Sequence, residues 1–289
     1  MAGHVSQLAT PNRRLGSLIA PREHGAWGLL LVPLATGGAV GVLAGGNALP
    51  LASLTIAALV LFWLRTPIES WLGIGLIRAR THQERRVVAI TILLLAKIAV
   101  AALISLFWMG RNFGLLYFGL AAIAAFTAQS FVRKLGRRGR MPAQIVGTLG
   151  LTVGAHAAYY VATGQFNRIG WALWTANFLF AGNQIHFVQL RIRSARLGNW
   201  REKFLRGYKF LIGQLVLAMA LAFFWHSHLL PALAALAFVP ILVRGVAWFF
   251  EGPKPLVVRA VGWTELAHAV IFGLLFVAGF ALSSNASLR

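Results

Sequence analysis

Apolar runs long enough to cross a lipid bilayer recur along the whole chain. A transmembrane helix needs about 20 mostly apolar residues to span the hydrocarbon core, and the sequence has nine runs of roughly that length. Charged residues make up only 11% of the chain, against about 25% in soluble domains. We therefore predict an all-α, polytopic integral membrane protein with nine transmembrane helices. The predicted spans are Gly25–Gly45, Ala48–Leu64, Val87–Met109, Phe113–Val132, Ala143–Thr163, Ile169–Leu190, Tyr208–Trp225, Leu229–Phe250 and Leu256–Leu282.

The charge balance excludes several classes of protein. The chain carries 27 Lys and Arg residues against 6 acidic ones, and 58% of its residues are hydrophobic. A nucleic-acid-binding domain of this charge would need a far more polar surface, so we expect neither a nucleic-acid partner nor a soluble enzyme. The sequence contains no Cys, which excludes disulfides and thiolate chemistry. It contains no Asp either, so every acidic residue is Glu.

Lys and Arg gather in alternate connecting segments, which predicts the orientation of the chain. Five lie within residues 65–86, five within 133–140 and seven within 191–209, whereas the intervening connections hold one or none. Arg244, Lys254 and Arg259 are counted together as the next basic group. Because basic connections stay cytoplasmic, we expect the N-terminus inside and the C-terminus outside.

The same pattern suggests a simple domain organisation. We expect residues 1–24 to form a loose cytoplasmic segment, residues 25–282 a single nine-helix transmembrane domain and residues 283–289 a short tail. Membrane lipids are the first expected partners, since a basic cytoplasmic face attracts anionic headgroups.

Polar side chains inside the predicted spans mark candidate functional groups, because polar groups facing lipid are costly. Asn183, His186 and Gln189 step by three along the sixth span, and such steps keep them broadly on one helix face. That face leads into the basic segment that begins at Arg191. We expect these residues to line a polar cavity that opens to the cytoplasm; the alternative is that they bond to neighbouring helices and only fix packing.

Three further polar residues form a candidate polar relay. His156 lies near the centre of the fifth span, and Glu265 and His268 are three residues apart on the ninth. Packing is again the alternative. Di-iron bundles use Glu-x-x-His twice together with two further Glu, and the motif occurs once here. We therefore predict no metal site.

The first span opens with an ionisable motif, PREHGAWG at residues 21–28. Arg22 can bind an anion, and Glu23 can orient that arginine. The N-terminus of a helix adds a favourable dipole for an anion at this position. Arg22, Glu23 and His24 are therefore candidate ligand-binding residues, with membrane anchoring as the alternative.

This motif, followed by Pro33 and Gly37, resembles the opening of the YwiC-like family of bacterial membrane proteins. The basic segment Arg133–Arg140 and the stretch from Trp174 to Arg191 fit the same family. The resemblance covers most of the chain, although only the N-terminal motif is specific. It implies a multi-pass protein of the bacterial inner (plasma) membrane and supplies no mechanism.

Nine helices with long basic connections after the second and sixth also resemble the plan of UbiA-type intramembrane prenyltransferases. Those enzymes hold magnesium on an isoprenyl diphosphate through Asp-rich motifs in these two segments. The corresponding stretches here contain no Asp, so we expect no magnesium cofactor, because Mg²⁺ is usually held by carboxylates and substrate phosphate. Arginine can bind phosphate oxygens without a metal. The candidate contacts in these stretches are Arg65, Glu69, Asn183, His186, Gln189 and Arg191.

The sequence supports three functional hypotheses. The first is a UbiA-like bundle that binds an anionic amphiphile, such as an isoprenoid, in a basic cavity, with metal-independent group transfer as its extension. The second is a small-molecule or proton-coupled transporter. The third is a non-catalytic accessory subunit of a respiratory or assembly complex.

Overall fold

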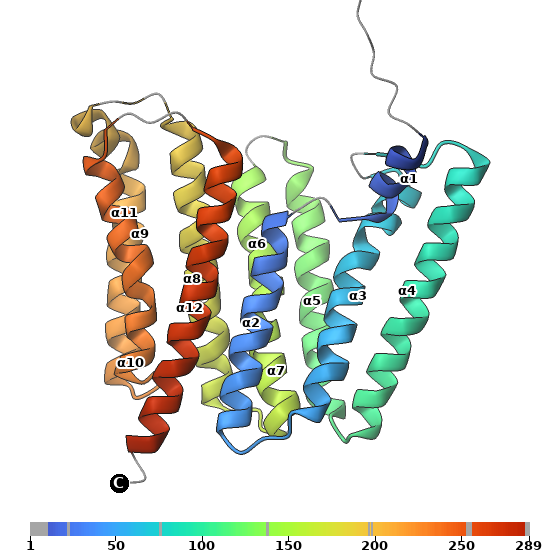
Figure 1. Ribbon diagram of the computed structural model, residues 1–289, viewed down its shortest axis with the longest axis horizontal. Helices are drawn as coiled ribbons and strands as arrows, with labels where there is room; N and C mark the ends of the chain where they lie inside the picture. Colours follow the sequence, from blue (N-terminus) through green and yellow to red (C-terminus); the bar gives the residue numbers. More distant parts are fainter. Residues whose placement is uncertain are drawn as a thin grey trace, which may run out of the picture. The chain divides into compact units, whose positions relative to one another are not determined.

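Helices account for all regular structure in the described parts of the chain (Figure 1). The computed structural model describes residues 11–21, 24–74, 77–136, 139–195, 197, 199–252 and 256–286. The elements are α1 (Pro11–Ile19), α2 (His24–Leu43), α3 (Leu49–Leu72), α4 (His82–Trp108), α5 (Asn112–Arg133), α6 (Arg140–Thr152), α7 (Gly154–Thr163), α8 (Arg168–Arg193), α9 (Trp200–His226), α10 (Ala232–Ala235), the 3₁₀ turn η1 (Leu236–Phe238), α11 (Val239–Phe250) and α12 (Val258–Ala286). The predicted all-helical class is confirmed.

Each predicted span coincides with one helix or with consecutive helices. Val153 divides the fifth run into α6 and α7, and the eighth run consists of α10, η1 and α11. Within the described residues, seven helical segments are long and apolar enough to cross a membrane. The apolar part of α2, Trp27–Leu43, is shorter, and α8 is not among the seven.

The first of two compact units contains α1, α4 and most of α3. Leu18 of α1 is fully buried and packs in one cluster with Val88. The Ser70 hydroxyl donates to the Leu18 carbonyl over 3.0 Å, and Trp63 Nε1 donates to the Ile19 carbonyl over 2.7 Å. The N-terminal segment, which we expected to be loose, therefore contains a packed helix.

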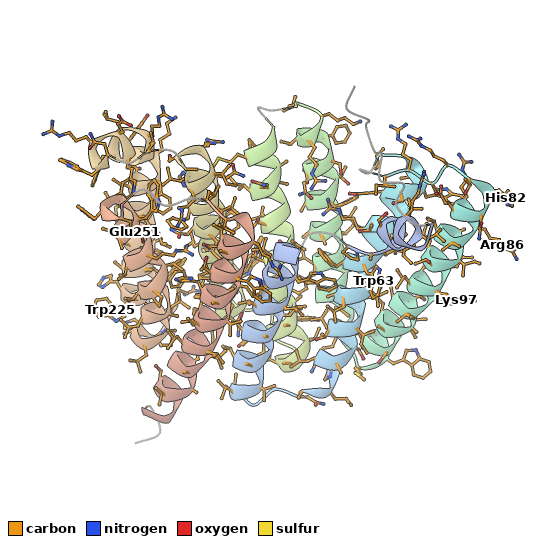
Figure 2. All side chains as sticks on the ribbon, turned by 45° about the horizontal axis from the view of Figure 1, so that its top comes forward. Trp63, His82, Arg86, Lys97, Trp225 and Glu251 are labelled. Atoms are coloured by element: carbon orange, nitrogen blue, oxygen red, sulfur yellow. The ribbon has the colours of Figure 1, made fainter. Side chains whose placement is uncertain are left out.

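A capping box starts α4 in this unit. Thr81 Oγ1 accepts from the Glu84 N–H over 3.1 Å, and Glu84 Oε2 accepts from the N–H groups of Arg80 and Thr81. Arg14 of α1 pairs with the other Glu84 oxygen at 2.9 Å. Lys97 lies further along the same helix, where its side chain is exposed and projects outward (Figure 2).

The second unit contains nearly all of α2 together with α5 to α12. Helix α8 packs against α6, α7, α9 and α11. Its Phe180 stacks on Phe272 of α12 with 4.0 Å between ring centroids, and Phe238 of η1 completes the cluster. These aromatic residues form part of the largest buried core of the unit.

Helices α2 and α7 approach closely because small residues line their contact. A Cβ at Gly37 would overlap the backbone of Ala155, and one at Gly41 would lie 2.8 Å from the Ala162 Cβ. Such approach of glycine-bearing faces is the usual way in which helices associate in lipid.

The connections between the helices of this unit lie at two opposite ends. Those between α5 and α6, α8 and α9, and α11 and α12 lie at one end, at the top of Figure 1, and the connection between α9 and α10 lies at the other. Arg133 and Arg191 belong to the first end, whereas Arg168 begins α8 at the second. Glu251 and Trp225 mark these two ends in Figure 2.

Candidate functional site

The N-terminal candidates fall largely outside the described residues. Arg22 and Glu23 are not described, and His24 is described only as the first residue of α2. The next pair, Arg65 and Glu69, lies one turn apart on α3 and is joined by a 2.8 Å ion pair. These two residues and His24 belong to the first unit, whereas the other described candidates belong to the second.

The three polar residues predicted to share one face of α8 bond to two different neighbours. Asn183 donates to Gln214 of α9 over 3.1 Å, and the His186 ring packs edge-on against Phe210 of the same helix. Gln189 instead donates to Gln144 of α6 over 3.1 Å. Asn183 and Gln189 therefore bond to neighbouring helices, as the alternative to a polar cavity predicts.

The candidate relay residues have separate surroundings. His156 of α7 is fully buried among the rings of Phe118, Phe166 and Trp171, whose centroids lie 4.7–4.9 Å away. His268 bonds within its own helix, with Nδ1 2.7 Å from the Thr264 carbonyl.

The third member of the relay, Glu265, pairs with an arginine that the sequence analysis did not single out. Arg244 Nη1 lies 2.6 Å from Glu265 Oε1. Counting Arg244 with the connecting cations was wrong, because the residue lies inside α11, which runs to Phe250. Its position within the apolar run Leu229–Phe250 is the signal that could have identified it.

This ion pair is well shielded. The side chains of Arg244 and Glu265 are 14% and 13% exposed. The guanidinium carbon of Arg244 lies 4.2 Å from the ring centroid of Phe187 on α8, in cation–π contact. Gln184, also on α8, donates to the Glu265 carbonyl over 2.8 Å. Three helices thus hold the pair in place.

Several buried polar atoms around the pair have no hydrogen-bond partner within the described parts of the chain. They include Nε and Nη2 of Arg244 and Oε2 of Glu265. Gln214 Nε2 on α9 and Asn183 Oδ1 on α8 are also buried and have no hydrogen-bond partner there. Buried polar groups are normally satisfied, so these unpartnered atoms are unusual among the described residues.

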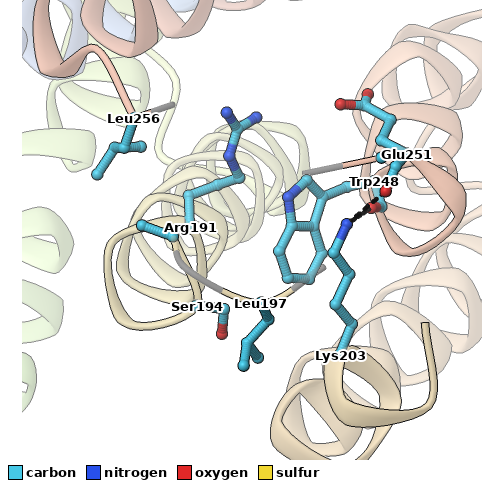
Figure 3. A pocket seen from close by; sticks show the side chains of 9 residues that line it. Arg191, Ser194, Leu197, Lys203, Trp248, Glu251 and Leu256 are labelled. Carbon is cyan, nitrogen blue, oxygen red and sulfur yellow. Dashed lines mark hydrogen bonds between the residues drawn. The ribbon is translucent and has the colours of Figure 1, made fainter. Parts of the chain in front are cut away.

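A small pocket lies at the basic end of α8, α9 and α11 (Figure 3). Arg191 and Ser194 line it from the end of α8, and Trp248 and Glu251 from the end of α11. The Lys203 amine, buried in the wall, donates to the carbonyl groups of Trp248 over 3.2 Å and Glu251 over 2.6 Å. Because these carbonyls terminate α11, Lys203 acts as a cationic cap of that helix.

Arg191 is the predicted candidate that this pocket contains. Its side chain is half-buried and lies beside the Phe187 ring, with 5.9 Å from Cζ to the centroid. Arg191 donates no hydrogen bond to any residue in the described ranges. The Ser194 hydroxyl, 3% exposed as a residue, has no partner there either. The pocket lining thus combines a guanidinium, a hydroxyl, the apolar surface of Trp248 and the acidic residue Glu251.

Within the described ranges, no group of three or more His, Cys, Asp or Glu side chains is placed to hold a metal ion. Each of the two clusters described above contains an arginine: Arg191 at the helix ends and Arg244 inside α11.

Long apolar helices with buried charge between them define a multi-pass helical membrane protein by length and composition. Residues 20–159 match the family model described as YwiC-like protein, so the predicted resemblance is confirmed over that stretch. The match ends within α7, before the two arginines. Neither the search of curated proteins nor that of solved structures gave a match, and the likeness to UbiA-type enzymes gains no support from them.

Proposed function

We propose that this YwiC-like protein crosses the bacterial inner membrane nine times, with its N-terminus inside, and binds an anionic amphiphile at its cytoplasmic face. Two observations support this topology: in the described parts of the chain each of the nine predicted spans coincides with helix, and basic connections gather at one end of the second unit (Figure 1).

The observation that carries the binding function is the position of Arg191. It lines a pocket at the basic end and has its guanidinium available, since no described residue accepts a hydrogen bond from it. Arginine recognises phosphate and carboxylate oxygens through paired N–H donors. Trp248 and Leu256 add apolar surface to the same pocket. A ligand with an anionic headgroup and an apolar tail fits this combination.

Isoprenyl phosphates belong to this ligand class together with anionic lipids. Both carry phosphate oxygens that Arg191 can bind without a metal ion. Transfer of the prenyl group would further require stabilisation of the developing charge on the leaving group. Arg244 is a shielded cation of the kind that could stabilise such a charge. The proposed function is binding alone.

The test is ligand binding to the full chain purified in a neutral detergent. Native mass spectrometry would compare phosphatidylglycerol and farnesyl phosphate with zwitterionic phosphatidylcholine. We expect a preference for the two anionic ligands and about tenfold weaker binding after Arg191→Gln, because a charge-assisted hydrogen bond contributes about 1.5–3 kcal/mol.

Arg193→Gln is the matched control. Arg193 lies two residues further on α8, is exposed and is absent from the pocket lining, yet its loss changes the net charge equally. Binding that shows no preference for anionic ligands, or that weakens equally in both variants, would contradict the proposed function.

A further inference from the structure

The guanidinium of Arg244 uses only one of its three nitrogens in the ion pair with Glu265. Nη1 meets Glu265 Oε1 at 2.6 Å, and the face of the group lies over the Phe187 ring. Nε and Nη2 are both buried and have no partner among the described residues. The N–H groups on these two nitrogens lie side by side on the planar guanidinium, which is the arrangement that binds two oxygens of a carboxylate or phosphate.

We infer that Arg244 is an inner oxyanion-binding site, separate from the pocket at the helix ends. Its ligand is a carboxylate or phosphate group bound in bidentate fashion through Nε and Nη2. The burial of these donors makes such an occupant favourable, because a buried donor without a partner costs about as much as its desolvation. This site goes beyond the amphiphile pocket proposed above.

The electrostatic surroundings should limit how strongly the site binds its ligand. Glu265 neutralises Arg244 and competes with any anion for the same cation. Gln214 and Asn183, which also have unpartnered buried atoms, add no charge. Removing the Glu265 charge should therefore strengthen oxyanion binding, whereas replacing both Arg244 and Glu265 by uncharged residues should abolish it.

The Phe187 ring relates the inner site to the pocket. Arg191 and Arg244 lie 5.9 Å and 4.2 Å from the centroid of this one ring. Trp248, which lines the pocket, follows Arg244 by one turn on α11. The same aromatic ring therefore contacts the cation of the pocket and the cation of the inner site.

The experiment measures thermal unfolding of the full chain with two sources of oxyanion. In neutral detergent, sodium phosphate and sodium acetate are compared with sodium chloride at equal ionic strength. In lipid nanodiscs, phosphatidylglycerol is compared with phosphatidylcholine. A raised Tm with the salts assigns the site to free oxyanions, and a raised Tm with phosphatidylglycerol alone assigns it to a lipid headgroup.

Variants decide whether Arg244 is responsible. Arg244→Lys keeps the charge and loses the paired edge, and we expect about tenfold weaker binding. Glu265→Gln should bind more tightly than the wild type. The double variant Arg244→Gln/Glu265→Gln keeps similar side-chain volumes without a buried lone charge, and it should lose the response even if the single variants fold poorly.

The inference is overturned if no oxyanion raises the Tm of the wild type, or if the response survives in the double variant. Arg191→Gln distinguishes the two sites. This variant should bind the amphiphile more weakly, whereas its Arg244-dependent rise in Tm should stay within twofold of the wild-type rise. If the wild type shows no preference for anionic amphiphiles while its Arg244-dependent response is intact, the proposed function alone is contradicted.

Discussion

Arg244 of α11 and Glu265 of α12 form an ion pair with 2.6 Å between Nη1 and Oε1, inside two otherwise largely apolar helices. Their helices bring together residues 21 positions apart in the chain. The Gln184 side chain of α8 donates a hydrogen bond to the backbone carbonyl of Glu265, which joins α8 to α12 beside the ion pair. This pair is a shielded ion pair within the second unit, and the first prediction concerns its contribution to stability.

Single neutralisation of the pair should be strongly destabilising. Arg244→Gln or Glu265→Gln leaves one buried charge without its partner, which typically costs about 3–5 kcal/mol. The double variant removes both charges, and its unfolding free energy should lie within about 1.5 kcal/mol of the wild type. Reversible unfolding in mixed detergent measures all three. Additive losses in the double variant would show that the pair is not coupled.

The glycine contact between α2 and α7 should be sensitive to a single methyl group. Gly37→Ala places a Cβ against the Ala155 backbone, so one helix must move. We expect a loss of about 1–3 kcal/mol in unfolding free energy. Gly119→Ala on α5 is the control, because a Cβ there meets nothing within 4 Å. Equal effects of the two substitutions would argue against close packing of α2 on α7.

His156 should be dispensable for stability. Both ring nitrogens are buried without a hydrogen-bond partner among the described residues, and the ring is surrounded by aromatic side chains. His156→Leu removes two unsatisfied polar atoms, so the unfolding free energy should stay within about 1 kcal/mol of the wild type or rise. The same unfolding measurement checks it. A loss above about 2 kcal/mol would instead assign the imidazole a specific bonding role.

The helices could be predicted from the sequence because lipid leaves few alternatives to a long apolar helix. Helix α1 was missed because only Leu15, Leu18 and Ile19 give it an apolar face in a polar segment. Their burial depends on Val88 and Ile92 of α4, which no local pattern indicates. A nine-residue helix has little stability alone, so its formation depends on this packing.

The candidate site was only partly predictable for a related reason. Steps of three place Asn183, His186 and Gln189 near one face of α8, but the neighbours decide that Asn183 meets Gln214 and Gln189 meets Gln144. Glu265 was identified as a polar residue in a span, whereas its arginine partner was assigned to a connection. Pairing between helices distant in sequence requires the tertiary structure.

The central claim is that the basic ends of the helices in the second unit face the cytoplasm and that their opposite ends face outward. The chain has no Cys, so single cysteines can be introduced cleanly. Arg193→Cys and Ser227→Cys lie in exposed positions at opposite ends of the second unit. In intact cells, a membrane-impermeant maleimide should modify only the cysteine of the Ser227→Cys variant. After the cells are opened, the cysteine of Arg193→Cys should be modified as well. Modification of both from one side, or of Arg193→Cys alone in intact cells, would contradict the account.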